Sequence, residues 1–491
     1  MRSTNIIVIC SDTFRRDHLG SLGRQQVVTP NLDRLAAESA NFEDYWLCSF
    51  PTLVNRIEVF TGRYTFPLMG WGPLPFHYPV LAEVLQRHGF TTALVTDNKH
   101  LMDETYGFGR GFDFVAHVRG QADDDFQPGS APMADLPCPV AKLDRRVDRL
   151  ERYRRNIRWH RQQGTSTTER TFRSALRWLD EPRSKFFLWI DSFDPHEPWD
   201  AEPRYAEPYP WNEAGDEVVW PRYGSAKTYS EADLANMQSL YKAEITRTDY
   251  CIGLLLDHLR DKKLLDTTTV IFCSDHGFYF GEHGRIGKLF LEPTAIYEEL
   301  GHLPLLLRHP AGLAAGQAIQ GLCQPPDLCA TIMELAGVAA VDWAHGQSLV
   351  PRLQGGRGTR RFAVAGCHPL KQHRSCLTVL TDEWCFIYSP YDGLEGSELY
   401  DRTSDPNQER NVLASHRVVA ERHFELLRAW LDELRVPRAR QRQLLYNAPF
   451  GWGNELRHRL WMWRNRRWHQ KHHGAAHRQP DRSSRQLHVS V

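Results

Sequence analysis

Two acidic residues at the ends of apolar segments are the clearest chemical signal in this sequence. Asp275 and His276 close an apolar, β-branched run over residues 268–274, and Asp12 closes a second run over residues 5–11. Such runs indicate buried strands, and open α/β folds place their chemistry at the carboxyl ends of these strands. Carboxylate and imidazole groups are ligands of divalent cations. We therefore expect Asp12, Asp275 and His276 to meet at one metal site on the rim of a sheet.

A hydroxyl residue at a predicted helix start is the third chemical element. Thr52 follows Pro51, and Arg56 comes one turn later. The start of a helix carries free amides and the positive end of the helix dipole, which together attract an anion. An arginine one turn further along can fork onto the oxygens of the same anion. Alone, this pattern fits an ordinary N-cap, but beside a metal site it predicts a nucleophile.

The elements that would position these residues alternate along the chain. Apolar runs over residues 91–96, 186–191 and 304–308 are separated by amphipathic segments such as 80–89 and 168–179. Continuous apolar strands between helices are typical of a parallel sheet that is buried on both faces. We predict an α/β fold with a large, mainly parallel sheet and helices on both faces.

The character of the sequence changes beyond about residue 355. Short strand-like runs end near residues 398–401, and an amphipathic helix is expected from about 415 to 434. The predicted division is a catalytic α/β domain (1–355), a smaller C-terminal α+β subdomain (356–446) and a basic, aromatic-rich tail (447–491). Within the first domain, residues 121–155 turn from acidic to basic, which predicts a surface insertion or a lid.

Composition excludes several classes of protein. The 491 residues include 60 Lys and Arg against 60 Asp and Glu, so a uniformly basic nucleic-acid binder is not expected. The sequence contains no apolar stretch long enough for a membrane span, and the N-terminal run is too short for a secretory signal. The ten cysteines have no CxxC spacing, which favours buried, reduced thiols and a cytoplasmic location.

The tail combines basic residues with tryptophans. Residues 451–491 hold nine Lys or Arg against Glu455 and Asp481. This composition is compatible with an anionic surface or with single-stranded nucleic acid, but we favour an arm that packs on the protein and then frays. The same arm would be able to clasp a second subunit, so a homo-oligomer through the tail is a further hypothesis.

An ordered set of motifs makes the chain resemble the sulfatase branch of the alkaline phosphatase superfamily. The matches run in family order over about residues 5–310, and residues 398–401 resemble the family's C-terminal subdomain. The matching segments are the strand that ends at Asp12, then Arg15 and residues 17–20, 60–63, 194–199, 274–277, 281–284, 287–288, 297–299 and 304–305. The resemblance implies an alkaline-phosphatase-like fold, a divalent metal ion and a small anionic ester as the substrate.

The nucleophile departs from the family pattern. Family sulfatases carry Cys-x-Pro-x-Arg, whose cysteine is oxidised to formylglycine, shortly before a Thr-Gly-Arg element. Counting back from residues 61–63 aligns the motif arginine with Arg56 and the modified cysteine with Thr52, whereas Cys48 falls four residues too early. A threonine at this position resembles the phosphodiesterase and phosphonate monoester hydrolase members of the superfamily.

A threonine nucleophile also changes the chemistry. A formylglycine hydrate releases sulfate through its second hydroxyl, but a threonine ester needs water or an alcohol to attack the central atom. Phosphoryl centres accept such a second displacement when cationic groups hold their oxygens. We therefore expect hydrolysis of phosphodiesters or phosphonate monoesters through a covalent Thr52 intermediate. The alternatives are a sulfatase without formylglycine, a transferase to an alcohol, and a binding homologue without turnover.

The resemblance also implies roles for single residues. Asp12, Asp275 and His276, with the Thr52 hydroxyl, would hold a divalent ion, and these ligands do not choose among Mn²⁺, Zn²⁺, Ca²⁺ and Mg²⁺. Thr13 stands where many sulfatases have a second aspartate ligand.

Further residues would contact the substrate. The family pattern implies that Lys288 holds the transferred group and that His196 contacts the substrate or protonates the leaving group. Lys99 and His100 fall where the family has additional polar contacts. Arg56 would orient the nucleophile loop and steady the anion. A second metal would need more ligands, for which His302 and Asp194 are available.

Overall fold

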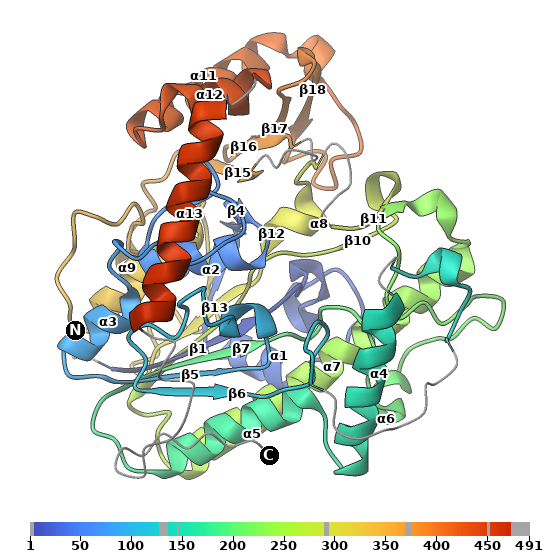
Figure 1. Ribbon diagram of the computed structural model, residues 1–491, viewed down its shortest axis with the longest axis vertical. Coiled ribbons are helices and arrows are strands. Elements are labelled where there is room, and N and C mark those ends of the chain that lie inside the picture. Colours follow the sequence, from blue (N-terminus) through green and yellow to red (C-terminus); the bar gives the residue numbers. More distant parts are fainter. Residues whose placement is uncertain are drawn as a thin grey trace.

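A central sheet of eight strands organises the catalytic part of the protein (Figure 1). The computed structural model describes residues 4–126, 136–144, 147–288, 294–368, 375–448 and 452–472. The strand order is β14-β2-β13-β9-β1-β7-β5-β6, in which β9, β1, β7, β5 and β6 are parallel and β13 is antiparallel to both of its neighbours. The predicted α/β fold with a mainly parallel sheet is confirmed. The strand bounds are β1 Asn5–Ser11, β2 Ala40–Phe42, β5 Thr91–Thr96, β6 Phe114–His117, β7 Phe186–Ser192, β9 Thr268–Ser274, β13 Leu305–Arg308 and β14 Ala318–Ile319.

Helices cover both faces of this sheet. This explains why the sequence of β1 is apolar throughout. Ile6 and Val8 belong to a core that includes α2, α3 and α9, whereas Ile7 and Ile9 belong to a core that includes α1, α5 and α7. A strand that is buried on both faces has no polar side to alternate with. The helix bounds are α1 Pro30–Ala37, α2 Thr52–Thr61, α3 Leu81–Arg87, α5 Thr167–Asp180, α7 Glu231–Asp261 and α9 Pro325–Leu335.

The three central strands end at the same level. Ser11 on β1 is in register with Ser192 on β7 and with Ser274 on β9. Since the strands are parallel, the residues that follow them emerge side by side at one edge of the sheet. This register brings Asp12 next to Asp275.

A second sheet of five strands belongs to the C-terminal part, in the order β18-β17-β16-β15-β4. Its edge strand β4 (Ser49–Phe50) comes from the N-terminal part and pairs with β15 through Gly366 and Cys367. The predicted boundary at residue 355 stays a prediction, but the sheet beyond it uses a strand from the first domain. The other bounds are β15 Ala363–Cys367, β16 Leu377–Leu380, β17 Trp384–Ser389, β18 Gly393–Asp401 and, packed on this sheet, α11 Arg417–Glu433.

The basic tail forms a helix, α13 (Trp452–His472), that lies across the front of the molecule in Figure 1. It follows α12 (Arg438–Tyr446), and its Asn465 and His469 are buried. Residues 473–491 of the predicted tail lie outside the described residues. None of the described helices is long and apolar enough to cross a membrane.

The charged insertion expected over residues 121–155 is partly helical. Residues 147–155 belong to α4 (Val147–Gln162), whose Leu150, Tyr153 and Ile157 pack into the core beneath α5 and α7. Residues 127–135 and 145–146 of this insertion lie outside the described residues.

Candidate active site

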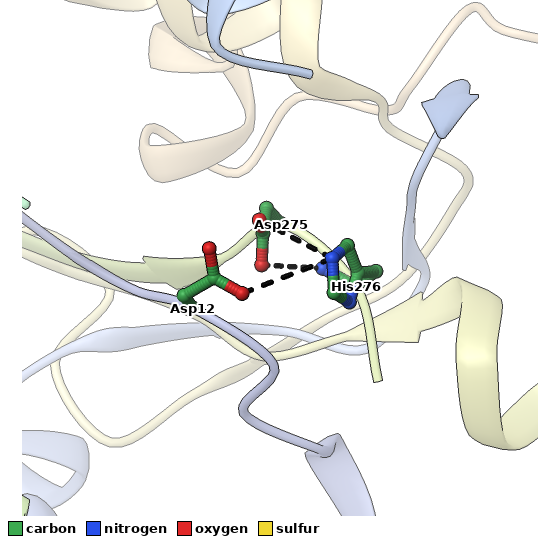
Figure 2. A group of neighbouring side chains, drawn as sticks. All are labelled: Asp12, Asp275 and His276. Atoms are coloured by element: carbon green, nitrogen blue, oxygen red, sulfur yellow. Dashed lines mark hydrogen bonds and ion pairs between the residues drawn. The ribbon is translucent and has the colours of Figure 1, made fainter. Parts of the chain in front are cut away.

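Asp12, Asp275 and His276 form one buried cluster at the carboxyl edge of the sheet, as Figure 2 shows. One ligand atom from each residue lies within 4.8 Å of the others. The His276 Nε2 atom is 3.8 Å from Asp12 Oδ1 and 3.6 Å from Asp275 Oδ2. The structure thus brings together the three side chains that the two strand ends predicted.

The imidazole of His276 is held in the form that binds a metal. Its Nδ1 atom is 3.1 Å from the Gly277 carbonyl oxygen, which only accepts hydrogen bonds, so Nδ1 carries the proton. The lone pair of Nε2 then faces the two carboxylates. Burial lowers the pKa of His276 to about 4, so the ring is neutral at physiological pH.

The two carboxylates of the cluster repel each other, and this repulsion favours a bound cation. Burial, together with the charge of Asp275, raises the pKa of Asp12 well above its ordinary value. Burial also acts to raise the pKa of Asp275, but Arg56 and His276 outweigh it and hold this pKa below its ordinary value. The Asp275 Oδ2 atom is buried, and its protein partner is the Arg56 guanidinium, 2.7 Å away. Two carboxylate oxygens and one imidazole nitrogen are a donor set that fits a divalent metal ion.

Thr52 is the hydroxyl residue at this cluster. It is the first residue of α2, and its Oγ1 atom is 3.3 Å from His276 Nε2. The ring of Phe50, two residues earlier, packs edge-on against the His276 ring with 5.0 Å between ring centroids. Cys48 instead lies in the core of the C-terminal part, where burial raises the pKa of its thiol well above the ordinary value. The structure therefore places Thr52, and not Cys48, beside the metal-ligand cluster.

Arg56 is engaged by carboxylates of the protein itself. Its Nε and Nη2 atoms donate to Asp191 at 2.8 and 3.1 Å, and its Nη1 atom is 2.7 Å from Asp275 Oδ2. A third carboxylate, Asp12, lies 3.8 Å from Nη2. The Arg56 guanidinium was expected to bind two oxygens of the substrate anion, and in the structure it binds both carboxylate oxygens of Asp191. The geometry therefore favours the other expected role of Arg56, which is to orient the loop. Asp191 was not predicted, although it ends an apolar run just as Asp12 does.

Lys288 reaches the cluster through Thr13. Its Nζ atom donates to Thr13 Oγ1 at 2.7 Å, and Thr13 Oγ1 donates to Asp12 Oδ1 at 2.8 Å. Thr13 has a φ angle of +66°, a strained conformation for a β-branched residue. A second carboxylate, Glu197, lies 3.3 Å from Lys288 Nζ. Thr13 thus places a hydroxyl that links a lysine to the cluster.

His196 lies on a loop between two buried anchors. Its Nδ1 atom donates to the Glu197 carbonyl oxygen, so the Nε2 atom of the neutral ring carries the lone pair. Burial, assisted by the charge of Lys288, lowers the pKa of His196 well below its ordinary value. On either side of the loop, Asp194 and Asp200 both contact the buried guanidinium of Arg247, at 2.6 and 3.5 Å.

Lys99 and His100 begin a short helical turn (Lys99–Met102) beside the site. The Lys99 Nζ atom contacts the Asp123 carbonyl oxygen and the Asp125 carboxylate, at 2.7 and 2.9 Å. His100 is close enough to His196 for its charge to lower the pKa of that residue. A small cavity of about 150 Å³ lies against both residues, and Trp71 and Tyr106 also line it. Both expected substrate contacts thus face the acidic insertion, because His100 Nε2 also lies 3.5 Å from Asp123 Oδ2.

The two extra ligand candidates lie away from the cluster. The imidazole of His302 contacts the Glu298 carboxylate and the Glu43 carbonyl oxygen, and Asp194 is bound by Arg247. Within the described ranges, Asp12, Asp275 and His276 are the one group of three or more such side chains whose geometry suits a metal ion.

Comparisons with known proteins identify the family to which this sequence is similar. The profile of the Sulfatase family matches residues 4–338, and that of the N-sulphoglucosamine sulphohydrolase C-terminal region matches residues 281–435. An N-acetylglucosamine-6-O-sulfatase of Bacteroides thetaiotaomicron is 23% identical over 472 residues, with 83% of this chain and 82% of the relative covered. A multifunctional alkaline phosphatase superfamily protein, PehA of Trinickia caryophylli, is 25% identical over 410 residues, with 73% and 78% covered.

Two solved structures share the fold. The phosphonate monoester hydrolase of Agrobacterium radiobacter superposes with a TM-score of 0.69 at 19% identity, over 88% of this chain and 96% of that one. A protein solved in complex with its substrate, D-glucosamine-2-N,6-O-disulfate, also has a TM-score of 0.69, at 18% identity, over 89% and 99%.

Proposed function

This chain belongs to the sulfatase family of hydrolases, and on that premise we propose that it hydrolyses phosphodiesters or phosphonate monoesters through a covalent intermediate on Thr52. The observation that carries the proposal is the position of the Thr52 hydroxyl, which lies 3.3 Å from His276 Nε2 at the start of α2. The hydroxyl is thus at the cluster, while the nearest cysteine in sequence, Cys48, is in the core.

The proposed reaction has two displacements. In the first, Thr52 Oγ1 forms a bond to phosphorus while the bond to the leaving oxygen breaks, and the proton that Thr52 loses is passed to the departing oxygen. In the second, a water oxygen bonds to phosphorus, the bond from phosphorus to Thr52 breaks, and Thr52 regains its proton. A threonine ester has no internal route of release, so the second displacement is required.

The side chains around Thr52 have complementary tasks in this scheme. The Lys288 ammonium, held by Thr13 and Glu197, would bind an oxygen of the transferred group. His196 is neutral in the free protein, and its Nε2 atom is a proton acceptor. We assign to it the proton of the attacking water. Arg56 would fix Thr52 relative to Asp275 through its ion pairs with Asp191 and Asp275.

Asp12, Asp275 and His276 would hold the divalent ion, with the Thr52 hydroxyl as a further ligand. Such an ion supplies Lewis acidity and positive charge at the nucleophile and at the oxygens of the transferred group. Burial of the cluster strengthens these electrostatic effects because water is excluded.

Sulfate esters are the second candidate substrate, because the relatives include a protein named as an N-acetylglucosamine-6-O-sulfatase. The likeness to a phosphonate monoester hydrolase supports the first candidate only at the level of the fold. Incubation with an aryl phosphodiester and with the aryl sulfate of the same leaving group separates the two candidates. A clear preference for the sulfate contradicts the first proposal.

Trapping of the intermediate is the most direct test. Protein quenched during turnover of a slow phosphodiester or phosphonate substrate is expected to carry an added phosphoryl or phosphonyl group on the peptide that contains Thr52. Intact mass and peptide mapping detect it. An aldehyde at Cys48 would contradict the assignment. An alcohol added as an acceptor reveals the transferase alternative by its product. Metal binding without turnover, in the unchanged protein as in Thr52→Ala, reveals the binding homologue.

We also propose a cytoplasmic location. The ten cysteines of the chain are free and buried, an arrangement that suits a reducing compartment.

A further inference from the structure

Helix α13 presents apolar side chains on two opposite faces. Toward the protein, Met462, Asn465 and His469 contact the segment over residues 72–107. Asn465 accepts a hydrogen bond from the Phe76 amide at 3.0 Å, and the His469 ring contacts the Leu74 carbonyl oxygen at 2.7 Å. The Met462 side chain is so close to Gly72 that a Cβ atom there would meet it at 2.1 Å. These contacts dock the helix and fix which face points outward.

The outer face carries an apolar stripe. Leu456, Leu460 and Trp463 are 59%, 49% and 52% exposed, and a spacing of i, i+4, i+7 places them on one side of a helix. They are three of the nine large hydrophobic residues that are exposed in the described part of the chain. A contiguous apolar stripe on an otherwise docked helix marks an interaction surface.

Cations flank this stripe. The sequence of α13 contains five arginines and one lysine against a single acid, Glu455. Arg457 and Arg459 lie between the two leucines in sequence, Arg464 and Arg467 follow them, and all four arginines are exposed. The Arg467 guanidinium lies over the Trp463 ring, 4.8 Å from its centroid. The outer face is therefore both apolar and strongly positive.

A hollow next to the stripe collects several of these groups. It has a volume of about 770 Å³ and is bounded by the rings of Phe76, Trp463 and Trp468 and by Arg464, Arg467 and Lys471. The Phe76 and Trp468 rings are stacked, with 5.7 Å between centroids. Three cations around a wide, open hollow suit an anionic head group, and the aromatic rings suit the boundary between head groups and acyl chains.

We propose that the outer face of α13 binds the surface of a membrane that contains anionic phospholipids. Leu456, Leu460 and Trp463 would enter the boundary between head groups and acyl chains, while the flanking arginines and Lys471 would contact phosphate groups. Basic helices that lie in the plane of a membrane surface divide these contacts in the same way. The proposal is independent of the reaction catalysed at Thr52.

Charge and shape favour this partner over the alternatives. A second copy of the chain, foreseen as a homo-oligomer through the tail, would bring two strongly positive helices together, and like charges repel. Single-stranded nucleic acid would use the arginines and Trp463, but it offers no apolar layer for Leu456 and Leu460. A bilayer surface offers anionic head groups to the arginines and an apolar layer to Leu456 and Leu460.

Co-sedimentation of the full-length protein with vesicles tests the proposal. The protein is expected to sediment with vesicles of phosphatidylcholine mixed with phosphatidylserine, to stay in solution with phosphatidylcholine alone, and to be released by salt. The combined substitution Leu456→Ser, Leu460→Ser and Trp463→Ser is expected to weaken binding at least about tenfold, because three apolar side chains no longer enter the lipid. Reversal of charge in Arg464→Glu with Arg467→Glu is expected to abolish the dependence on phosphatidylserine.

A matched control is available on another part of the surface. Trp211 is 44% exposed outside the tail, and Trp211→Ser is expected to leave vesicle binding unchanged. The fold of each variant is checked by its circular dichroism and melting temperature. Equal sedimentation of the triple variant and the unchanged protein overturns the proposal. An absence of vesicle binding also overturns it when sizing shows dimers that the triple variant does not form. The same holds when the protein binds a labelled single-stranded oligonucleotide and the triple variant does not.

Discussion

Arg56 Nη1 lies 2.7 Å from Asp275 Oδ2, and neither side chain is accessible to water. The same guanidinium forks onto Asp191. One arginine on α2 is therefore fixed both to β7 and to the residue that follows β9. A guanidinium that is buried in this way destabilises the fold unless it is fully paired. The two ion pairs of Arg56 therefore keep the start of α2 in a single position.

Loss of the Asp191 carboxylate is expected to destabilise the protein strongly. In Asp191→Asn the Arg56 guanidinium keeps its burial but loses a charged partner, which costs about 3–5 kcal/mol. Urea unfolding of the variant and the unchanged protein measures the difference. Asp44→Asn is the matched control, because its ion pair with Arg402 is partly exposed, and we expect it to cost at most about 1 kcal/mol. Equal losses in the two variants would contradict the special role of the Arg56 pair.

Removal of the Thr52 hydroxyl is expected to abolish turnover. Thr52→Ala should lower kcat at least about a thousandfold because the covalent route is lost, whereas Thr52→Ser retains a hydroxyl and should keep measurable activity. Thr61→Ala is the control on the same helix, since the hydroxyl of Thr61 bonds only the Ile57 carbonyl oxygen. Rates with an aryl phosphodiester, together with the phosphoryl adduct detected by mass spectrometry, decide the outcome. Normal turnover by Thr52→Ala would show that another group is the nucleophile.

Metal removal is expected to inactivate the enzyme reversibly. Dialysis against a chelator should abolish hydrolysis, and separate additions of Mn²⁺, Zn²⁺, Ca²⁺ and Mg²⁺ should show which ion restores it. Asp275→Asn and His276→Ala should each lower the affinity for that ion, measured by calorimetry, at least about tenfold. His302→Ala serves as the control because His302 lies outside the cluster. Full activity without any bound metal would refute the assignment of the ligands.

Acid is expected to destabilise the fold through buried histidines, of which His160 is a clear case. It is 1% exposed, and burial lowers its pKa to about 4, whereas in the unfolded chain its pKa is about 6.5. The unfolded state therefore binds more protons between these values, and stability falls as the pH decreases from about 6.5 to 4.

The contribution of His160 approaches about 1.4 kcal/mol per pH unit within that window. Unfolding free energies at several pH values should show a shallower dependence in His160→Gln. The substitution His416→Gln, at an exposed position, should leave the slope unchanged. An identical slope in the His160 variant would mean that this histidine is not buried as a neutral ring.

The sheet and the metal cluster were predictable because they rest on local patterns. The apolar pattern of a strand predicts that it is buried, and an acid at its end predicts the edge of the sheet at which that acid lies. Asp12 and Asp275 could therefore be predicted to be neighbours although more than 260 residues separate them. The same signal was present at Asp191, at the end of β7. It was overlooked because no family motif marks that position.

Contacts that depend on backbone strain or on loops were not predictable. The link from Lys288 to Asp12 requires Thr13 to adopt a positive φ angle, and no sequence pattern specifies this for a threonine. The ion pair between Lys99 and Asp125 in the insertion was also not predicted, and the substrate contact of Lys99 stays a prediction. The partner of a charged side chain depends on the folded structure, and the spacing of residues along the sequence does not specify it.

The pairing of β4 with β15 sets an order of events during synthesis. Residues 49–50 cannot take their place in the second sheet until residues 366–367, more than three hundred positions later, have left the ribosome. Thr52 begins its helix two residues after β4, so we expect it to reach its place late, after the surrounding parallel strands have had time to assemble. In a nascent chain, Asp12, Asp275 and His276 are accordingly expected to come together before Thr52 joins them.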